Sequence, residues 1–217
     1  MALPAAAPNR KLQHRRCIDV EVFARGDGLW EVDARLIDVK SRDVKLAHGM
    51  RRAGEPLHDL LLRLVIDERF NILDAGSESR AVPYPGHCEM LDAGSDDRPD
   101  DGAGDAYRGL VGLNLMQGFR QAVRQRLGGV RGCTHLSEMS QTLPTAVVQA
   151  FAGVVIDTRG ESADGPRPFQ IDRCHALRAD GAVVSEHYPR WFRQGSVSCA
   201  ADTAPPSTPS PTLEISS

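Results

Sequence analysis

The sequence lacks the long apolar run that a membrane-spanning helix requires. The longest candidate, from Ala146 to Ile156, is interrupted by Gln149 and Gly153 and is shorter than the roughly 18 residues that cross a bilayer. The first residues, 1–8, lack both the basic region and the apolar region of a secretory signal. We therefore expect a cytoplasmic protein that has no membrane partner.

Cysteine is scarce and odd in number, with five residues in a chain of 217. In the absence of an export signal, this number argues against a disulfide framework and in favour of free thiols or metal ligands. The rest of the composition, 41% hydrophobic and 25% charged with a net charge of −3, is typical of a soluble globular domain.

Several catalytic motifs are also missing. The chain has no phosphate-binding Walker loop, and Gly109 and Gly112 do not have the spacing of the dinucleotide fingerprint. It has no Gly-x-Ser-x-Gly sequence, which would place a serine nucleophile between a strand and a helix. A nucleotide cofactor and a serine hydrolase are therefore disfavoured.

Three segments are expected to be irregular. Residues 1–15 form a basic arm, which is more often a solvated tail than a nucleic-acid site, so we expect no nucleic-acid partner. Residues 194–217 are rich in Pro, Ser and Thr and are expected to be disordered. Residues 92–105 hold six aspartates without the spacing of a calcium-binding loop. Residues 16–193 remain as a single expected domain, with 92–105 as an Asp-rich loop.

Alternating apolar and polar residues predict three β-hairpins. Their paired strands are 18–24 with 29–37, 57–66 with 70–73, and 168–177 with 182–184. In the second hairpin Leu60, Leu62, Leu64 and Ile66 share one face, which indicates a largely buried strand. Three hairpins suggest one antiparallel sheet, whose edges would allow a homodimer without requiring one.

Helical spacing appears between the second and third hairpins. A helix is predicted from an N-cap at Asn114 to Gly128, because apolar residues recur every four positions up to Leu127. The stretch 134–152 is also helical, but Pro144 divides it into two short helices. The predicted fold is therefore α+β, an antiparallel sheet of β-hairpins with two or three helices packed on one side.

Cysteine and histidine lie close together at three places in the expected domain: His87 with Cys88, Cys133 with His135, and Cys174 with His175. Thiolate and imidazole are preferred zinc ligands, and a catalytic zinc needs three protein ligands and an open position. No Cys-x-x-Cys pair occurs, so the fold would have to assemble any such site. We expect the ligands of a zinc or iron ion to be Cys88, Cys133, His135 and one of Cys174 or His175.

The local geometry restricts these candidates. Cys174 and His175 are neighbours in a predicted strand and would face opposite sides, so one of them can serve. If a helix begins at Thr134, Cys133 lies at its N-terminus, where a thiolate is stabilised and can act as a ligand or a nucleophile. The alternative interpretation is that the cysteines are small buried hydrophobic residues.

Two further residues are candidates for catalysis beside His135. His58 should share a face with Leu60, with its neighbour Asp59 facing away, and it would be a ligand or a general base. A histidine that merely satisfies its hydrogen bonds at a strand entrance is an equally good interpretation. Tyr84 lies in a rigid turn between Pro83 and Pro85, where it would act as a gate or a hydrogen-bond donor, although an aromatic packed between prolines is the commoner explanation.

Several strings together resemble one protein family. They are residues 27–34, 53–59, 83–88, 127–136 and 172–177, and they occur in order. On these strings the chain from about Arg16 to Arg193 is similar to the bacterial domain of unknown function 2889, from which the Asp-rich loop and the tail are departures.

The resemblance implies an enzymatic activity. It points to small-molecule enzymes of aromatic catabolism, and in particular to lyases that release formaldehyde from a hydroxymethyl side chain of an aromatic substrate. In such a reaction a histidine, a metal-bound hydroxide or a tyrosinate would remove the hydroxyl proton. We expect the enzyme to be metal-assisted. Two alternatives stay open: a cofactorless enzyme in which Cys133 and His135 act directly, and a non-catalytic domain with a structural metal.

Overall fold

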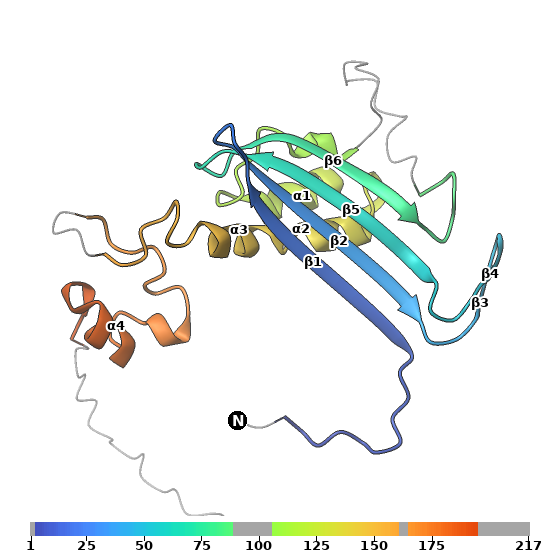
Figure 1. Ribbon diagram of the computed structural model, residues 1–217, viewed down its shortest axis with the longest axis horizontal. Helices are drawn as coiled ribbons and strands as arrows, with labels where there is room; N and C mark the ends of the chain where they lie inside the picture. Colours follow the sequence, from blue (N-terminus) through green and yellow to red (C-terminus); the bar gives the residue numbers. More distant parts are fainter. Residues whose placement is uncertain (1–2, 89–105, 161–164, 195–217) are drawn as a thin grey trace, which may run out of the picture. The chain divides into compact units, whose positions relative to one another are not determined.

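The computed structural model describes residues 3–88, 106–160 and 165–194 (Figure 1). The chain divides into two compact units, Met1–Ile156 and Asp157–Ser217. The boundary between them falls inside the range 16–193 that the sequence suggested as one domain. The predicted Asp-rich loop and all but the first residue of the predicted tail lie outside the described residues.

The first unit is built on a four-stranded antiparallel sheet in the order β1-β2-β5-β6. Its strands are β1 (His14–Ala24), β2 (Trp30–Lys40), β5 (Pro56–Ile66) and β6 (Ile72–Ala81). The first two predicted hairpins are thus confirmed, and each strand is longer than predicted. Between β2 and β5 the chain forms a small unpredicted hairpin of β3 (Val44–Leu46) and β4 (Gly49–Arg51).

Short polar turns connect these strands. In the β1–β2 turn Gly28 has a φ of +82°, a conformation that favours glycine, and the Asp27 carboxylate accepts a hydrogen bond from the Leu29 amide. In the β5–β6 turn the Asp67 carboxylate accepts hydrogen bonds from the Arg69 and Asn71 amides. These side chains fix the register in which the strands pair.

Three helices pack against one face of the sheet: α1 (Phe119–Leu127), α2 (Thr134–Ser140) and α3 (Leu143–Phe151). In Figure 1 α1 and α2 lie behind the strands. The predicted α+β fold is confirmed, with short 3-10 turns at Ala106–Leu110 and Gly129–Arg131. None of the described helices has the length and apolar character that a bilayer crossing would need.

The helix boundaries confirm one prediction and correct another. Pro144 is the second residue of α3, where its missing amide hydrogen costs no helical hydrogen bond, so the predicted division into two helices is right. The predicted N-cap at Asn114 is wrong, because α1 begins at Phe119. The Asn114 side chain instead donates hydrogen bonds to the Arg69 carbonyl and to Asn71.

The core lies between the sheet and the helices. The predicted buried face of β5 is confirmed, since Leu60, Leu62, Leu64 and Ile66 are all almost fully buried. They pack in one cluster with residues of β2 and of all three helices, including Val32, Leu36, Phe119, Val123, Met139, Val147 and Phe151. This packing sets the position of α2 against the sheet.

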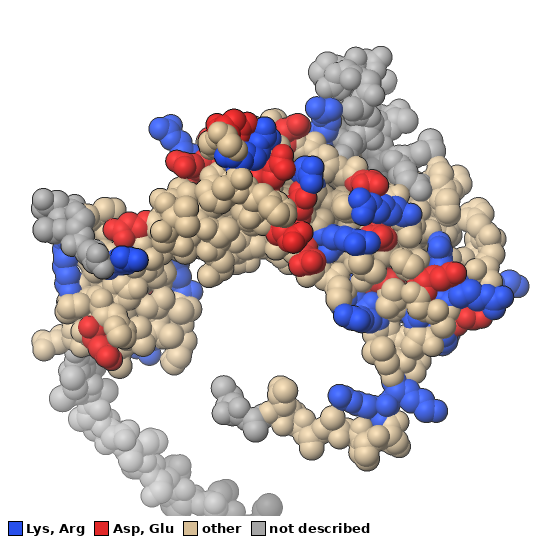
Figure 2. Space-filling model, viewed as in Figure 1, with Lys and Arg blue, Asp and Glu red and all other residues tan. Residues whose placement is uncertain are grey.

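The other face of the sheet is charged. Figure 2 shows acidic and basic side chains interspersed over the strands. The Arg63 guanidinium donates to both carboxylate oxygens of Asp33, and Arg35 does the same to Asp59. As predicted, Asp59 therefore faces away from the side chain of its neighbour His58.

The second unit contains α4 (Ala182–His187) and two 3-10 turns, His175–Leu177 and Pro189–Trp191, around buried Ile171, Ala179 and Val184. The third predicted hairpin is wrong, because residues 168–184 form turns, a 3-10 segment and the start of α4. The Asp172 amide donates to the Leu177 carbonyl, and its carboxylate accepts from the Ala179 amide. These local bonds close the segment into a loop, which the alternating pattern alone does not reveal.

The burial of Leu64 gives a test of the packing. The side chain has no exposed surface, so Leu64→Ala should lower the free energy of unfolding by about 3 kcal/mol. The matched control is Val130→Ala, because Val130 is fully exposed and its loss should change the value by less than about 0.5 kcal/mol. Urea denaturation of both variants measures the difference, and equal losses would contradict the packing described.

Candidate active site

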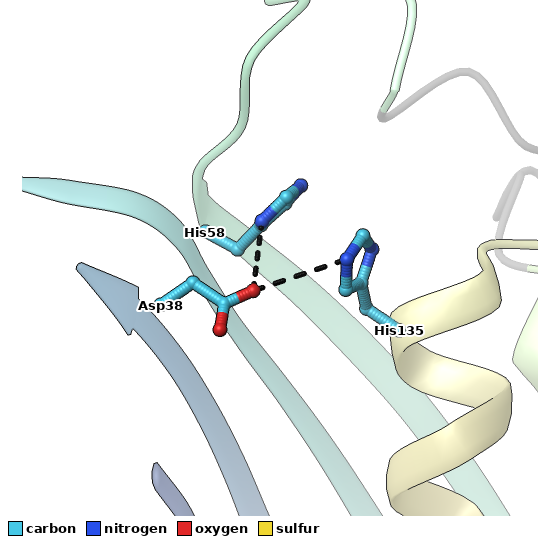
Figure 3. A group of neighbouring side chains, drawn as sticks. All are labelled: Asp38, His58 and His135. Atoms are coloured by element: carbon cyan, nitrogen blue, oxygen red, sulfur yellow. Dashed lines mark hydrogen bonds and ion pairs between the residues drawn. The ribbon is translucent and has the colours of Figure 1, made fainter. Parts of the chain in front are cut away.

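A row of polar side chains crosses the helix-covered face of the sheet at one end. Arg16 on β1 pairs in register with Asp38 on β2, and Asp38 pairs with His58 on β5. The next row along the same face is apolar and consists of Ile18, Leu36 and Leu60. The polar row therefore begins where the apolar core ends, and the first turn of α2 brings His135 to the same place (Figure 3).

Asp38 is the centre of this group and is only 2% exposed. The Arg16 guanidinium donates from Nε to Oδ1 at 2.8 Å and from Nη2 to Oδ2 at 2.7 Å. The His14 Nε2 lies 2.9 Å from Oδ1. Burial opposes ionisation of the Asp38 carboxyl, but the hydrogen bonds and charges of Arg16 and His14 outweigh it and lower the pKa to about 2. Asp38 is thus a carboxylate at neutral pH.

His58 is oriented by this carboxylate. Its Nδ1 lies 3.1 Å from Asp38 Oδ2, and because an ionised carboxylate can only accept, Nδ1 must carry the hydrogen. A neutral imidazole then has its lone pair on Nε2. Burial, followed by the neighbouring His135, lowers the pKa of His58 below its ordinary value, despite the opposing effect of Asp38. His58 is therefore a neutral imidazole with Nε2 ready to accept a proton.

His135 lies against His58 with a centroid separation of 3.9 Å and an angle of 33° between the ring planes. Its Nε2 is 3.8 Å from Asp38 Oδ2, which is beyond hydrogen-bond distance. Figure 3 marks this contact with a dashed line. Burial and the charge of Arg16 lower the pKa of His135 as well. Its side chain is 27% exposed, against 12% for His58, so His135 is the more accessible imidazole.

Arg16 also connects the sheet to α2. Its Nη1 donates to Glu138 Oε2 at 2.5 Å, while Nε and Nη2 hold Asp38. One guanidinium therefore fixes the helix that carries His135 against the strands that carry Asp38 and His58. The two imidazoles owe their relative position to this bridge as well as to the core.

The structure brings together two of the predicted site residues, His58 and His135. The helix α2 begins at Thr134, so Cys133 lies at its N-terminus, which is one of the arrangements that the sequence left open. The Cys133 Sγ lies 3.9 Å from His135 Nδ1. Asp38, His58 and His135 have ligand atoms that lie within 4.8 Å of one another. In the described part of the chain, this is the one group of three or more His, Cys, Asp or Glu side chains that could hold a metal ion. The predicted cysteine ligands do not belong to this group.

The other predicted residues lie elsewhere. Cys88 is half-buried and packs against the core of the first unit. Tyr84 is 51% exposed, and its ring meets the edge of His48 with a centroid distance of 6.4 Å. Cys174 and His175 belong to the second unit and are exposed there, and they lie in and beside a 3-10 turn rather than in a strand.

Sequence reasoning missed His14, Arg16 and Asp38. Arg16 was assigned to the beginning of the domain, beside a basic arm, whereas β1 already begins at His14. Asp38 continues the inward alternation of Val32, Ala34 and Leu36. Extending the predicted strand beyond residue 37 would therefore have placed a carboxylate on the core face of the sheet.

A hollow of about 520 Å³ lies on the charged face of the sheet and is not part of this site. It is lined mainly by outward-facing residues of β5 and β6, among them Leu61, Arg63, Val65 and Glu78. Arg63 there is already paired with Asp33, and the residues of the Asp38 group are not among its lining.

Comparison with known families gives a match to the family described as "Protein of unknown function (DUF2889)" over residues 14–149. The chain belongs to this family. The match covers β1 to α3 and so includes the whole Asp38 group, whereas Cys174 and His175 lie beyond it. Comparison with curated proteins and with solved structures finds no match.

The low pKa of Asp38 predicts a specific loss of stability in acid. A carboxyl whose pKa falls on folding, here from 3.8 to about 2, stabilises the native state above the unfolded pKa, and this contribution disappears as the pH falls through the folded value. The difference in unfolding free energy between the native protein and Asp38→Asn should therefore shrink by about 2 kcal/mol between about pH 5 and pH 2. Denaturant titrations at each pH measure it. A difference independent of pH would contradict the ion pair.

Proposed function

We propose that this chain is a small-molecule enzyme and that its active site is the Asp38 group, with His58 as the general base. The observation that carries the proposal is the 3.1 Å contact from His58 Nδ1 to a buried carboxylate that Arg16 holds on both oxygens. A histidine whose tautomer is set by a fixed carboxylate is the arrangement that general-base catalysis requires.

For the reaction class we propose a lyase that releases formaldehyde from a hydroxymethyl side chain of an aromatic compound. This class is the one expected from the family resemblance in the sequence, and an acid–base pair of imidazoles suits it. His58 Nε2 would take the hydroxyl proton, the carbon–carbon bond would break to give formaldehyde, and the electron pair would pass to the conjugated substrate. A proton delivered to the carbon that carried the hydroxymethyl group replaces the broken bond and completes the balance.

His135 would supply the second function of the pair. It lies against His58 and is more exposed, so a substrate can reach it while His58 takes the proton. It would donate a hydrogen bond to the substrate or return the proton to carbon. Asp38 would stabilise the imidazolium that forms on His58, and Arg16 would keep Asp38 ionised.

Formaldehyde release from lignin-derived aromatic dimers with a free hydroxymethyl group tests this function. We expect the purified native protein to release formaldehyde, and His58→Gln to lower kcat by a factor of about 10² to 10⁴, the usual contribution of general-base catalysis. The matched control is His48→Gln, which removes an exposed imidazole outside the Asp38 group. Formaldehyde is measured by derivatisation, and full activity of His58→Gln would contradict the assignment of the base.

A metal-assisted mechanism is the second candidate. One carboxylate and two imidazoles with their ligand atoms within 4.8 Å of one another form the donor set of non-haem iron and of many zinc enzymes. Asp38, His58 and His135 would hold the ion, which would supply a Lewis acid or a bound hydroxide. The charge balance is less favourable, because both oxygens of Asp38 already accept from the cationic Arg16. For that reason we place the acid–base mechanism first.

Elemental analysis separates the two candidates. The acid–base mechanism predicts less than about 0.1 zinc or iron per chain after expression with ample metal, and activity that survives chelators. About one ion per chain that is lost in both His58→Gln and His135→Gln would instead establish the metal centre.

Cys133→Ser tests the remaining alternative, in which the thiol acts directly. The acid–base account predicts that this variant keeps its activity, because Cys133 Sγ is 3.9 Å from His135 and Cys133 is not part of the Asp38 group. Loss of activity in Cys133→Ser together with alkylation of the native thiol by iodoacetamide would favour a cysteine nucleophile instead.

A further inference from the structure

The strand β1 has a free edge. Among the described strands it pairs with β2 alone, and in Figure 1 it forms one border of the sheet. Next to its ends the Arg25 amide donates to the Leu29 carbonyl, and the Ser41 amide donates to the Gln13 carbonyl. Odd-numbered residues therefore direct their backbone groups toward β2, and the even-numbered residues from His14 to Ala24 direct theirs to the free edge. Such a row of amides and carbonyls is a template for a further strand.

The outward-facing charges of β1 differ from those of the neighbouring strands. On β2 and β5, Asp33 pairs with Arg63 and Arg35 with Asp59 within the sheet, and Glu31 pairs with Arg25 of the β1–β2 turn. On β1, by contrast, the side chains of Arg15, Asp19 and Glu21 are exposed and make no hydrogen bond or ion pair with any described residue. Their order along the strand is basic first and acidic second, so an antiparallel copy of the same strand would meet them with opposite charges.

We propose that β1 pairs antiparallel with β1 of a second copy of this chain, about a two-fold axis at Ile18. This register places Arg15 opposite Glu21 of the second copy, twice in each dimer, and pairs residues 14–22 of both strands. An axis at Asp19 would set two aspartates against each other, and an axis at Cys17 would shorten the paired segment. Charges at an edge usually prevent pairing, but here they are segregated along the strand and complementary to a second copy.

The pairing also has a consequence for the Asp38 group, although it does not depend on the proposed function. On the helix-covered side of the sheet, Val20 of the second copy lies opposite Arg16. Arg16 is the residue that holds both Asp38 and Glu138. The second copy therefore covers the β1 side of the candidate site.

Charge reversal at the two paired positions tests the proposal with the full chain. Sedimentation velocity over a range of concentrations should show a dimer for the native protein. Arg15→Glu and Glu21→Arg should each raise the dissociation constant at least about tenfold, because each replaces two attractive pairs with two repulsive ones. The double variant should restore the native constant, since the pairs are then exchanged. Glu68→Arg, a reversal at an exposed turn, is the control and should have no effect.

The outcomes decide the proposal. A native protein that stays monomeric at every concentration overturns it, as does a double variant no tighter than the single ones. Far-UV circular dichroism and the thermal midpoint establish that all variants are folded. Because the exchange of charges restores dimerisation only if the two residues meet, a loss through misfolding cannot imitate the expected pattern.

A cross-link tests the register. With the axis at Ile18, Cys17 lies opposite residue 19 of the second copy in a position where side chains approach closely, so Asp19→Cys should form a covalent dimer on oxidation. Cys17→Ser combined with Asp19→Cys should not. A covalent dimer that forms equally in the native protein and requires Cys17 would place the axis at Cys17 and overturn this register.

Discussion

The candidate site depends on the ion pair between Arg16 and Asp38. Asp38 is nearly fully buried, and a buried carboxyl without a partner would take up a proton and become neutral. The guanidinium keeps it ionised, so that Asp38 can accept the hydrogen of His58 Nδ1 and leave Nε2 as the base. Arg16 also donates to Glu138, so the same guanidinium links α2, and with it His135, to the sheet. The side chain of Arg16 therefore both keeps Asp38 ionised and joins the helix α2 to the sheet.

Much of the first unit could be predicted from sequence. The alternation in residues 57–66 located the buried face of β5, and Pro144 located the break between α2 and α3. Both signals are local, because one depends on side-chain alternation and the other on a missing amide hydrogen. His58 was identified from its place in the same alternation, on the face of Leu60, and His135 from its place two residues after Cys133.

The rest depends on contacts that no local pattern contains. Asp38 meets Arg16 and His58 through the register of three strands, and its significance arises only when α2 closes over them. The cysteines near histidine suggested a thiolate metal site, but Cys88 is half-buried against the core and Cys174 lies in the second unit. The third predicted hairpin is wrong because the amide and the carboxylate of Asp172 form hydrogen bonds with nearby residues of the same loop. An alternating pattern of apolar and polar residues cannot exclude such a loop.

The measurement that tests the central claim most directly is the tautomer of His58, observed by ¹⁵N NMR of the imidazole nitrogens at neutral pH. The account predicts a hydrogen on Nδ1 and a bare Nε2 in the native protein, and a shift toward the Nε2–H form in Asp38→Asn, where the carboxylate no longer selects Nδ1. A native His58 that is protonated on both nitrogens, or that carries its hydrogen on Nε2, would contradict the role assigned to Asp38 and to Arg16.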